Sequence, residues 1–85
     1  MNSYKVFISK SVYKKLEKLP VQIEQKLLDC ILSLQHNPRP QGYKKLKDRN
    51  GYRIRSGDYR IIYQIKDREL LILILDIGHR RDIYQ

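Results

Sequence analysis

The chain has 85 residues, of which 18 are lysine or arginine and 9 are aspartate or glutamate, giving a formal net charge of +9. A chain of this length forms one domain, residues 1–85, with a single core, so we expect any active site to be a surface groove rather than an enclosed chamber. The positive excess makes a polyanion, nucleic acid above all, the expected partner, because neutralising phosphates releases their condensed counterions.

The first part of the chain predicts a short strand followed by two helices. Residues 4–8 read as the strand, and Ser9 suits the N-cap of a first helix that stops before Pro20. Proline suits the first turn of a helix, so Pro20 opens the second one. The predicted apolar face of the first helix consists of Val12, Leu16 and Leu19. That of the second consists of Ile23, Leu27, Cys30, Ile31 and Leu34.

Several common features of exported and membrane proteins are absent from the sequence. Cys30 is the one cysteine, so it cannot form an internal disulfide, and its place on an apolar helix face predicts a buried, inert thiol. The N-terminal stretch lacks the apolar segment of a signal peptide, and the run LLILIL is far shorter than a membrane span. We therefore expect a soluble cytoplasmic protein without a membrane partner.

The remainder of the chain predicts a loop and three strands. The stretch HNPRPQG, with two prolines and a glycine, ends the second helix, and residues 42–50 follow as a basic loop. Strands are predicted at about 51–56, 58–66 and 70–77. The order β-α-α-β-β-β predicts an α+β fold, with a small antiparallel or mixed four-stranded sheet and both helices packed on one face.

The stretch YRIRSGDYRIIY places three arginines in one predicted hairpin. With Ser56-Gly57 as a two-residue loop, Arg53 lies opposite Arg60, and Arg55 shares their face. Tyrosine and isoleucine side chains fill the other face. Like charges opposite one another destabilise a sheet by roughly 0.2–1 kcal/mol, and a broken local rule often marks a functional site.

The last strand predicts an apolar surface beside these arginines. Alternation carried across the KDRE turn places Leu70, Ile72 and Ile74 on the tyrosine and isoleucine side. The residues predicted on the arginine side are Leu71, Leu73, Leu75 and Ile77. Either this surface binds a partner, or loops and C-terminal residues cover it.

The hairpin YRIRSGDYRIIYQI, the strand ELLILILDIG and the ending GHRRDIYQ resemble the RelE/ParE superfamily of bacterial and archaeal toxins, most closely the RelE-type messenger-RNA interferases. The resemblance spans nearly the entire chain. It implies the toxin of a type II toxin–antitoxin system, which cleaves mRNA in the ribosomal A site and is silenced by a cognate antitoxin. ParE-like inhibition of DNA gyrase stays open as an alternative, as does a non-enzymatic nucleic-acid-binding module.

The resemblance also assigns roles to individual residues. The family's site residues fall on Arg53, Arg55, Arg60, Arg80 and Tyr84, with His79 at a position that varies among relatives. The basic pair Arg53 and Arg55 is lysine in the best-known member. Since arginine stays protonated in proteins, this pair is suited to binding phosphate and is a poor base.

Metal-free RNA cleavage uses the substrate's 2′-hydroxyl as nucleophile, so the enzyme supplies a base, an acid and cations for the phosphoryl charge. Arg60 and Arg80 are assigned to that charge, because a guanidinium binds two phosphate oxygens at once. His79 and Tyr84 are the candidates for proton transfer. Histidine titrates close to neutral pH, whereas tyrosine requires nearby cations to lower its pKa. The basic loop residues Lys44, Lys45 and Lys47 either track RNA phosphates or form an ordinary charged loop.

Metal ligands and cofactor motifs are not predicted. The acidic residues are scattered, and neither an H-x-x-x-H nor a C-x-x-C spacing occurs. We therefore expect no metal, no small-molecule cofactor and a catalytic set made of arginine, histidine and tyrosine.

Overall fold

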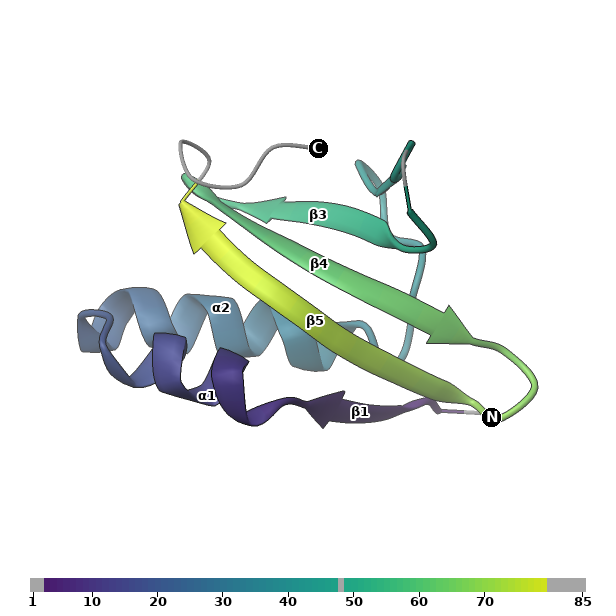
Figure 1. Ribbon diagram of the computed structural model, residues 1–85, viewed down its shortest axis with the longest axis horizontal. Coiled ribbons are helices and arrows are strands. Elements are labelled where there is room, and N and C mark those ends of the chain that lie inside the picture. The colour runs from purple at the N-terminus through teal and green to yellow at the C-terminus, as the bar shows by residue number, and fades with distance from the viewer. Residues whose placement is uncertain (1–2, 48, 80–85) are drawn as a thin grey trace.

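A computed structural model describes residues 3–47 and 49–79. The elements are β1 (Lys5–Ile8), α1 (Lys10–Glu17), α2 (Val21–Ser33), β2 (Lys44–Lys45), β3 (Tyr52–Ser56), β4 (Tyr59–Lys66) and β5 (Leu71–His79). The strands form one five-stranded sheet in the order β1-β5-β4-β3-β2, in which β1 and β5 are parallel and the other neighbours antiparallel. Both helices lie on the same side of the sheet (Figure 1). The predicted α+β class is confirmed, and the predicted count of four strands is wrong by one.

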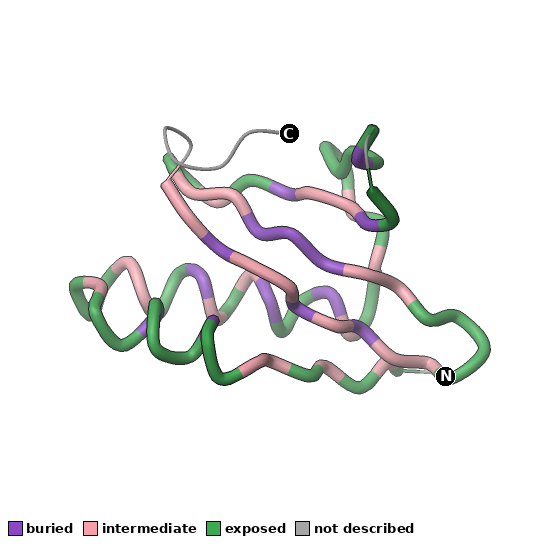
Figure 2. Tube along the Cα trace, in the orientation of Figure 1, coloured by how far each residue is buried: buried purple, intermediate pink, exposed green. Residues whose placement is uncertain are grey.

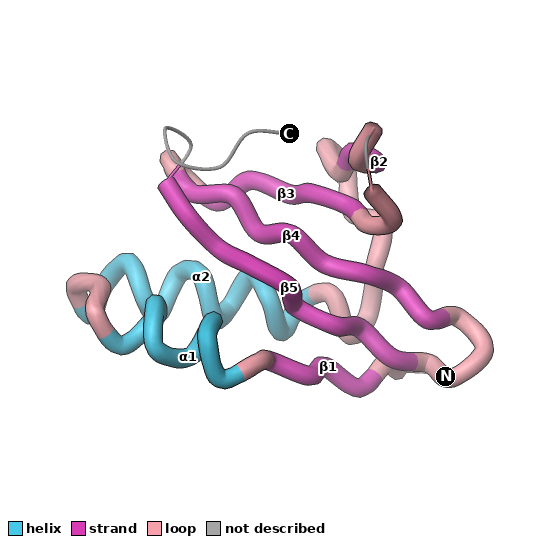
Figure 3. The backbone as a smooth tube through the Cα atoms, in the orientation of Figure 1, coloured by secondary structure: helices cyan, strands magenta, loops and turns pink. Residues whose placement is uncertain are grey.

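The additional strand, β2, lies inside the predicted loop 42–50 (Figure 3). Its two residues are too few to show the alternation that marks a strand in a sequence. The turn after β2 is closed by the Leu46 N–H, which donates to the Gly51 carbonyl at 3.0 Å. Gly51 suits this turn because a Cβ there would lie 3.2 Å from both Leu46 Cδ1 and the Tyr63 carbonyl oxygen.

The core lies between the helices and the sheet (Figure 2). The Ser9 hydroxyl accepts the Val12 N–H at 3.3 Å, which confirms the predicted cap of α1. The fully buried apolar residues of the two helices and of the C-cap of α2 are Val12, Leu16, Leu27, Ile31 and Leu34. Neither described helix is long and apolar enough to span a membrane.

The β3–β4 hairpin has a different register from the predicted one. Its two-residue loop is Gly57-Asp58, and Gly57 has a φ of +62°, which suits the first position of a type II′ loop. Arg55 therefore lies directly opposite Arg60, and Arg53 opposite Ile62. Because the pairing moves by one residue on each strand, the two faces keep their predicted residues. Arg53, Arg55 and Arg60 share the face that carries no described helix, which we call the open face.

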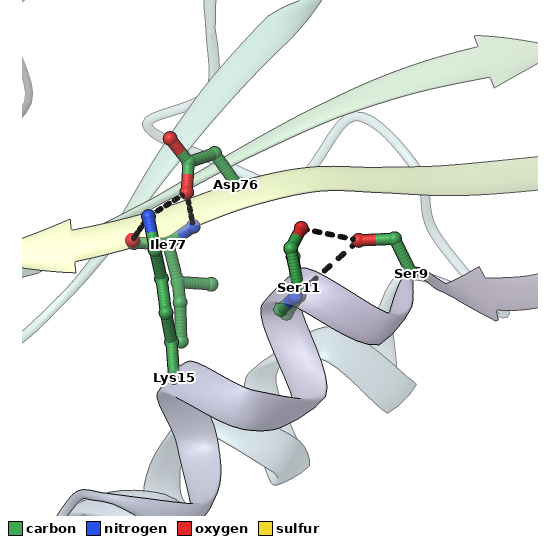
Figure 4. Close-up of polar contacts among 6 residues, drawn as sticks. Ser9, Ser11, Lys15, Asp76 and Ile77 are labelled. Carbon is green, nitrogen blue, oxygen red and sulfur yellow. Dashed lines mark hydrogen bonds and ion pairs between the residues drawn. The ribbon is translucent and has the colours of Figure 1, made fainter.

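A β-bulge in β5 changes the predicted faces of its last residues. The register shifts where Ile62 and Tyr63 face β5, so Ile74 and Ile77, three residues apart, both point into the core. The prediction that Ile77 shares the arginine side is therefore wrong. At the bulge, Asp76 Oδ1 accepts from Lys15 Nζ of α1 at 2.5 Å and from the Ile77 N–H at 2.9 Å (Figure 4).

The β4–β5 turn also departs from the prediction at Leu70. This residue lies before β5 and has a φ of +52°, the left-handed conformation that few residues with a side chain adopt. Its carbonyl accepts the Lys5 N–H at 2.8 Å. The turn is thereby attached to the start of β1.

The loop between α2 and β2 is held against the sheet by side-chain contacts. Arg39 forms an ion pair with Asp67 of the β4–β5 turn at 2.9 Å, and the Tyr4 hydroxyl donates to the same carboxylate at 2.7 Å. The Tyr63 hydroxyl donates to the Pro38 carbonyl at 2.7 Å. These contacts fix the segment from which β2 continues.

Candidate functional site

Four basic residues come together on three neighbouring strands of the open face. We define the arginine cluster as Lys44 of β2, Arg53 and Arg55 of β3, and Arg60 of β4. In the ladders, Lys44 pairs with Arg53, and Arg55 pairs with Arg60. Directly paired residues have side chains on the same face, about 4.5–5.5 Å apart at Cβ. The strand pairing therefore concentrates positive charge on one side of β2, β3 and β4.

The charges of the cluster act on one another. Burial lowers the pKa of Arg53, and the positive charges of Arg60 and Arg55 lower it further. Lys44, Arg53 and Arg55 make no ion pair with any described carboxylate. The cluster therefore has positive charge available for an anion, and a phosphate matches the bidentate geometry of a guanidinium.

The other predicted basic residues are placed differently. Lys45 pairs with Tyr52 and so lies on the opposite face of β2 from Lys44. Lys47 is exposed after the end of β2. The structure thus separates three lysines that the sequence places in one loop, and puts Lys44 alone among them beside the arginines.

His79 lies on the other face of the sheet from Arg53, Arg55 and Arg60. It pairs with Tyr59, their rings meeting edge to face with centroids 5.5 Å apart, whereas Arg60 pairs with Gly78. Tyr59 packs against the core on the helix side, so His79 lies on that side of the sheet end. A surface pocket of about 300 Å³ there is lined by His79, Tyr59, Asp76 and Lys15, among others. Arg80 and Tyr84 lie outside the described residues.

The apolar part of the open face lies on β1 and β5. Phe7 pairs with Leu73, and its side chain is 59% exposed. Leu71 and Leu73 are half-buried on the same face. The sequence placed these leucines correctly, but it gave no indication that Phe7 would join them, since the parallel pairing of β1 with β5 is a long-range contact. Among the residues that the structure describes, no group of three His, Cys, Asp or Glu side chains is arranged to hold a metal ion.

Comparison with known proteins identifies the family. Residues 6–84 match the family described as the ParE toxin of type II toxin–antitoxin systems, parDE. The chain belongs to this toxin family. It is 30% identical over 84 residues to toxin RelG of Mycobacterium tuberculosis, a match that covers 96% of this chain and 97% of RelG. The predicted relationship to the RelE/ParE superfamily is thereby confirmed.

Chains of solved RelE–RelB-type complexes have the same fold. A chain of the RelBE2 toxin–antitoxin complex of Mycobacterium tuberculosis aligns with a TM-score of 0.83 and 28% identity, covering 94% of each chain. A chain of the archaeal RelE–RelB complex of Pyrococcus horikoshii aligns with a TM-score of 0.82 and 33% identity, covering 92% of this chain and 96% of that one. This toxin therefore shares both fold and approximate length with these relatives.

Proposed function

We propose that this toxin is a ribosome-dependent endoribonuclease that cleaves mRNA in the cytoplasm without a metal ion. The observation that carries the proposal is the arginine cluster, in which cations from three adjacent strands share one open face. A cluster of guanidinium groups on one face suits a polyanion that passes through a transition state of increased negative charge. The similarity to RelG and to a chain of the RelE–RelB complex supports the RelE type of activity.

In the proposed reaction the 2′-hydroxyl oxygen of the RNA attacks the adjacent phosphorus. The new bond to O2′ forms as the bond to the 5′-oxygen breaks, which leaves a 2′,3′-cyclic phosphate and a free 5′-hydroxyl. A base accepts the proton of the 2′-hydroxyl, and an acid protonates the departing 5′-oxygen. We assign Arg60 and Arg80 to the phosphoryl oxygens, and Arg53 and Arg55 to the orientation of the RNA backbone.

Proton transfer is assigned to Tyr84 and His79, with Tyr84 first because His79 lies on the helix side of the sheet. The test is the pH profile of single-turnover cleavage in Tyr84→Phe and His79→Ala. Loss of one limb of the profile in Tyr84→Phe, with an unchanged profile in His79→Ala, supports this order. The reverse result makes His79 the proton-transfer residue, and unchanged profiles in both remove both candidates.

The decisive experiment maps the 5′ ends of cellular messages after brief induction of the toxin. We expect new ends inside translated regions with the wild type and their loss with Arg60→Ala. Arg68→Ala is the matched control, because Arg68 is an exposed residue of the β4–β5 turn at the other end of β4. Wild-type cleavage by Arg60→Ala, with folding intact, contradicts the catalytic assignment.

A gyrase inhibitor of the ParE type is the second candidate, because the matching family is described as the ParE toxin. In that case the same fold binds a protein target, and the arginines have no chemical role. Inhibition of gyrase supercoiling by the purified protein, with messages left whole, would replace the first proposal by this one. A protein that binds RNA but does neither is a non-enzymatic nucleic-acid-binding module.

The open face as a whole is the proposed binding surface for a cognate antitoxin. Structurally similar chains come from the toxin–antitoxin complex RelBE2 and from the archaeal RelE–RelB complex. An antitoxin segment with apolar and acidic side chains would cover the apolar part around Phe7 and also neutralise the arginine cluster. We expect Phe7→Ser to weaken binding of the antitoxin encoded beside the toxin by at least about 1 kcal/mol, measured calorimetrically, and to leave cleavage unchanged. Unchanged antitoxin affinity would place the antitoxin elsewhere.

A further inference from the structure

A second cavity lies beside the arginine cluster, where α2, the loop at residues 40–42 and the edge of β3 meet. Its volume is about 430 Å³, within the range of small-molecule pockets. Its lining residues are Cys30, Ser33, Pro40, Gln41, Gly42, Lys44, Arg53, Ile54 and Arg55. The pocket exists because β2 is short: it pairs with β3 only at Tyr52 and Arg53, so Ile54 and Arg55 continue past its end.

The lining of this pocket has basic side chains that no acidic side chain of the lining neutralises. Lys44, Arg53 and Arg55 are among its nine lining residues, and no acidic residue is. Two other pockets formed by described residues differ in this respect. One of about 180 Å³ has Lys26 with Asp58, and the one of about 300 Å³ has Lys15 with Asp76. The pocket beside the cluster is therefore the one of the three whose charge favours an anionic ligand.

One wall of the pocket is held in place before any ligand binds. The loop at residues 40–42 follows Pro38 and Arg39, which are fixed by the Tyr63 hydroxyl and by the Asp67 carboxylate. The Asn37 side-chain oxygen also accepts the Arg39 N–H at 3.2 Å. A wall that is already ordered reduces the entropy cost of binding.

We propose that this pocket binds a nucleotide of the RNA strand next to the cleaved phosphodiester, with Lys44 and Arg53 on its phosphate and its ribose or base against the pocket lining. Arg53 and Arg55 lie two residues apart on β3, about 6.6 Å along the strand. This separation lets the two guanidinium groups contact successive phosphates instead of a single one. The inference rests on the proposed RNA substrate and extends the binding site from the open face around the edge of the sheet.

Cys30 provides a direct probe of the pocket, since it lines the cavity and is the one cysteine of the chain. The probe ligand is a short 2′-O-methyl oligonucleotide, which lacks the nucleophilic hydroxyl and so cannot be cleaved. The measurement is the rate of alkylation of Cys30 by N-ethylmaleimide in the full chain. Burial raises the pKa of this thiol, so the reaction is followed at one fixed alkaline pH. At ten times the Kd we expect the oligonucleotide to slow alkylation about tenfold.

Lys44→Gln and Lys45→Gln form a matched pair for this test. Both remove one charge from the same short strand, but Lys44 lines the pocket and Lys45 lies on the other face of β2. We expect Lys44→Gln to weaken the protection of Cys30 and to reduce the slope of log Kd against log salt by about 0.7. At a given occupancy by the oligonucleotide, we expect Lys45→Gln to leave the protection of Cys30 from alkylation unchanged.

Different results would overturn the pocket and the nuclease activity. An oligonucleotide that binds, as judged by fluorescence anisotropy, without slowing alkylation overturns the pocket, as does an equal loss of protection in the two lysine variants. Message cleavage by a toxin whose Cys30 is never protected overturns the pocket and leaves the nuclease standing. Protection of Cys30 in a protein that cleaves no message supports the pocket and overturns the nuclease.

Discussion

Replacement of Arg55 by glutamine tests whether charge repulsion within the arginine cluster lowers the stability of the sheet. Arg55 is exposed and lies directly opposite Arg60 in the β3–β4 ladder. Like charges in this position destabilise a sheet by roughly 0.2–1 kcal/mol. Glutamine keeps a polar side chain and removes the charge, so we expect the free energy of unfolding to rise by about 0.2–1 kcal/mol. In a domain of this size the melting temperature would rise by about 1–8 °C.

Urea unfolding followed by circular dichroism, at low and at high salt, measures this change. At about 1 M salt the Debye length falls to about 3 Å, so the gain from Arg55→Gln should shrink as the repulsion is screened. Arg68→Gln is the control, because Arg68 lies in a turn between Asp67 and Glu69 and its removal relieves no repulsion. A loss of stability in Arg55→Gln at low salt, or a gain that salt leaves unchanged, would refute the argument that charge crowding is the cause.

The same substitution should reduce activity while it increases stability. A hydrogen bond to a charged group contributes about 1.5–3 kcal/mol, so loss of a phosphate contact in the transition state lowers single-turnover cleavage by about 10- to 160-fold. Opposite signs for stability and activity are expected only where the charge is retained for binding. A variant that is both more stable and fully active would show that Arg55 does not contact the RNA.

Substitutions at three further positions test the contacts that support the site, with urea unfolding as the measurement. Asp67→Asn should be less stable than the wild type near neutral pH, because Arg39 and the Tyr4 hydroxyl hold the pKa of Asp67 below its ordinary value of 3.8. The wild type should lose this advantage in unfolding free energy as the pH falls through and below that value. A difference that stays constant with pH would contradict the ion-pair argument. Gly57→Ala should lower the free energy of unfolding by about 1–2 kcal/mol because of the left-handed backbone alone, since a Cβ there meets nothing within 4 Å. Gly57→Asn should lower it by less, because asparagine adopts the left-handed conformation more readily. Equal losses in the two variants would exclude backbone strain as the cause. Tyr63→Phe should cost about 0.5–1.5 kcal/mol by removing its hydrogen bond to the loop, and an unchanged stability would mean that the loop is held by other contacts.

The sequence predicted those parts of the fold in which apolar and polar residues follow one another in a regular pattern. The helices follow from spaced apolar residues and from the cap at Ser9, and the shared face of the three arginines follows from strict alternation in β3 and β4. The face was predicted correctly although the predicted register was wrong. The true pairing is displaced by one residue on each strand, so every residue stays on its predicted face of the sheet.

The parts that the sequence missed depend on long-range packing. Residues 70–75 are all leucine or isoleucine, so nothing in the pattern marks the bulge that turns Ile77 and His79 to the helix side. The strand β2 exists because the turn at Gly51 returns the chain to β3. With two residues, this strand is too short to show the alternation of side chains that predicts a strand. The pocket beside the cluster combines α2, a loop and β3, which only the tertiary structure brings together.

The open face has two halves, and each is unfavourable in the isolated chain for a different reason. The half on β2, β3 and β4 holds like charges together, and the half on β1 and β5 exposes Phe7 to water beside half-buried leucines. RNA bound as proposed would relieve the first half alone, because its phosphates neutralise charge but do not cover an apolar surface. A protein segment with acidic and apolar side chains relieves both halves at once. An antitoxin that covers the whole face, as proposed, would therefore bind more tightly than RNA, and the affinity gained on the apolar half would be the margin by which it excludes RNA from the toxin.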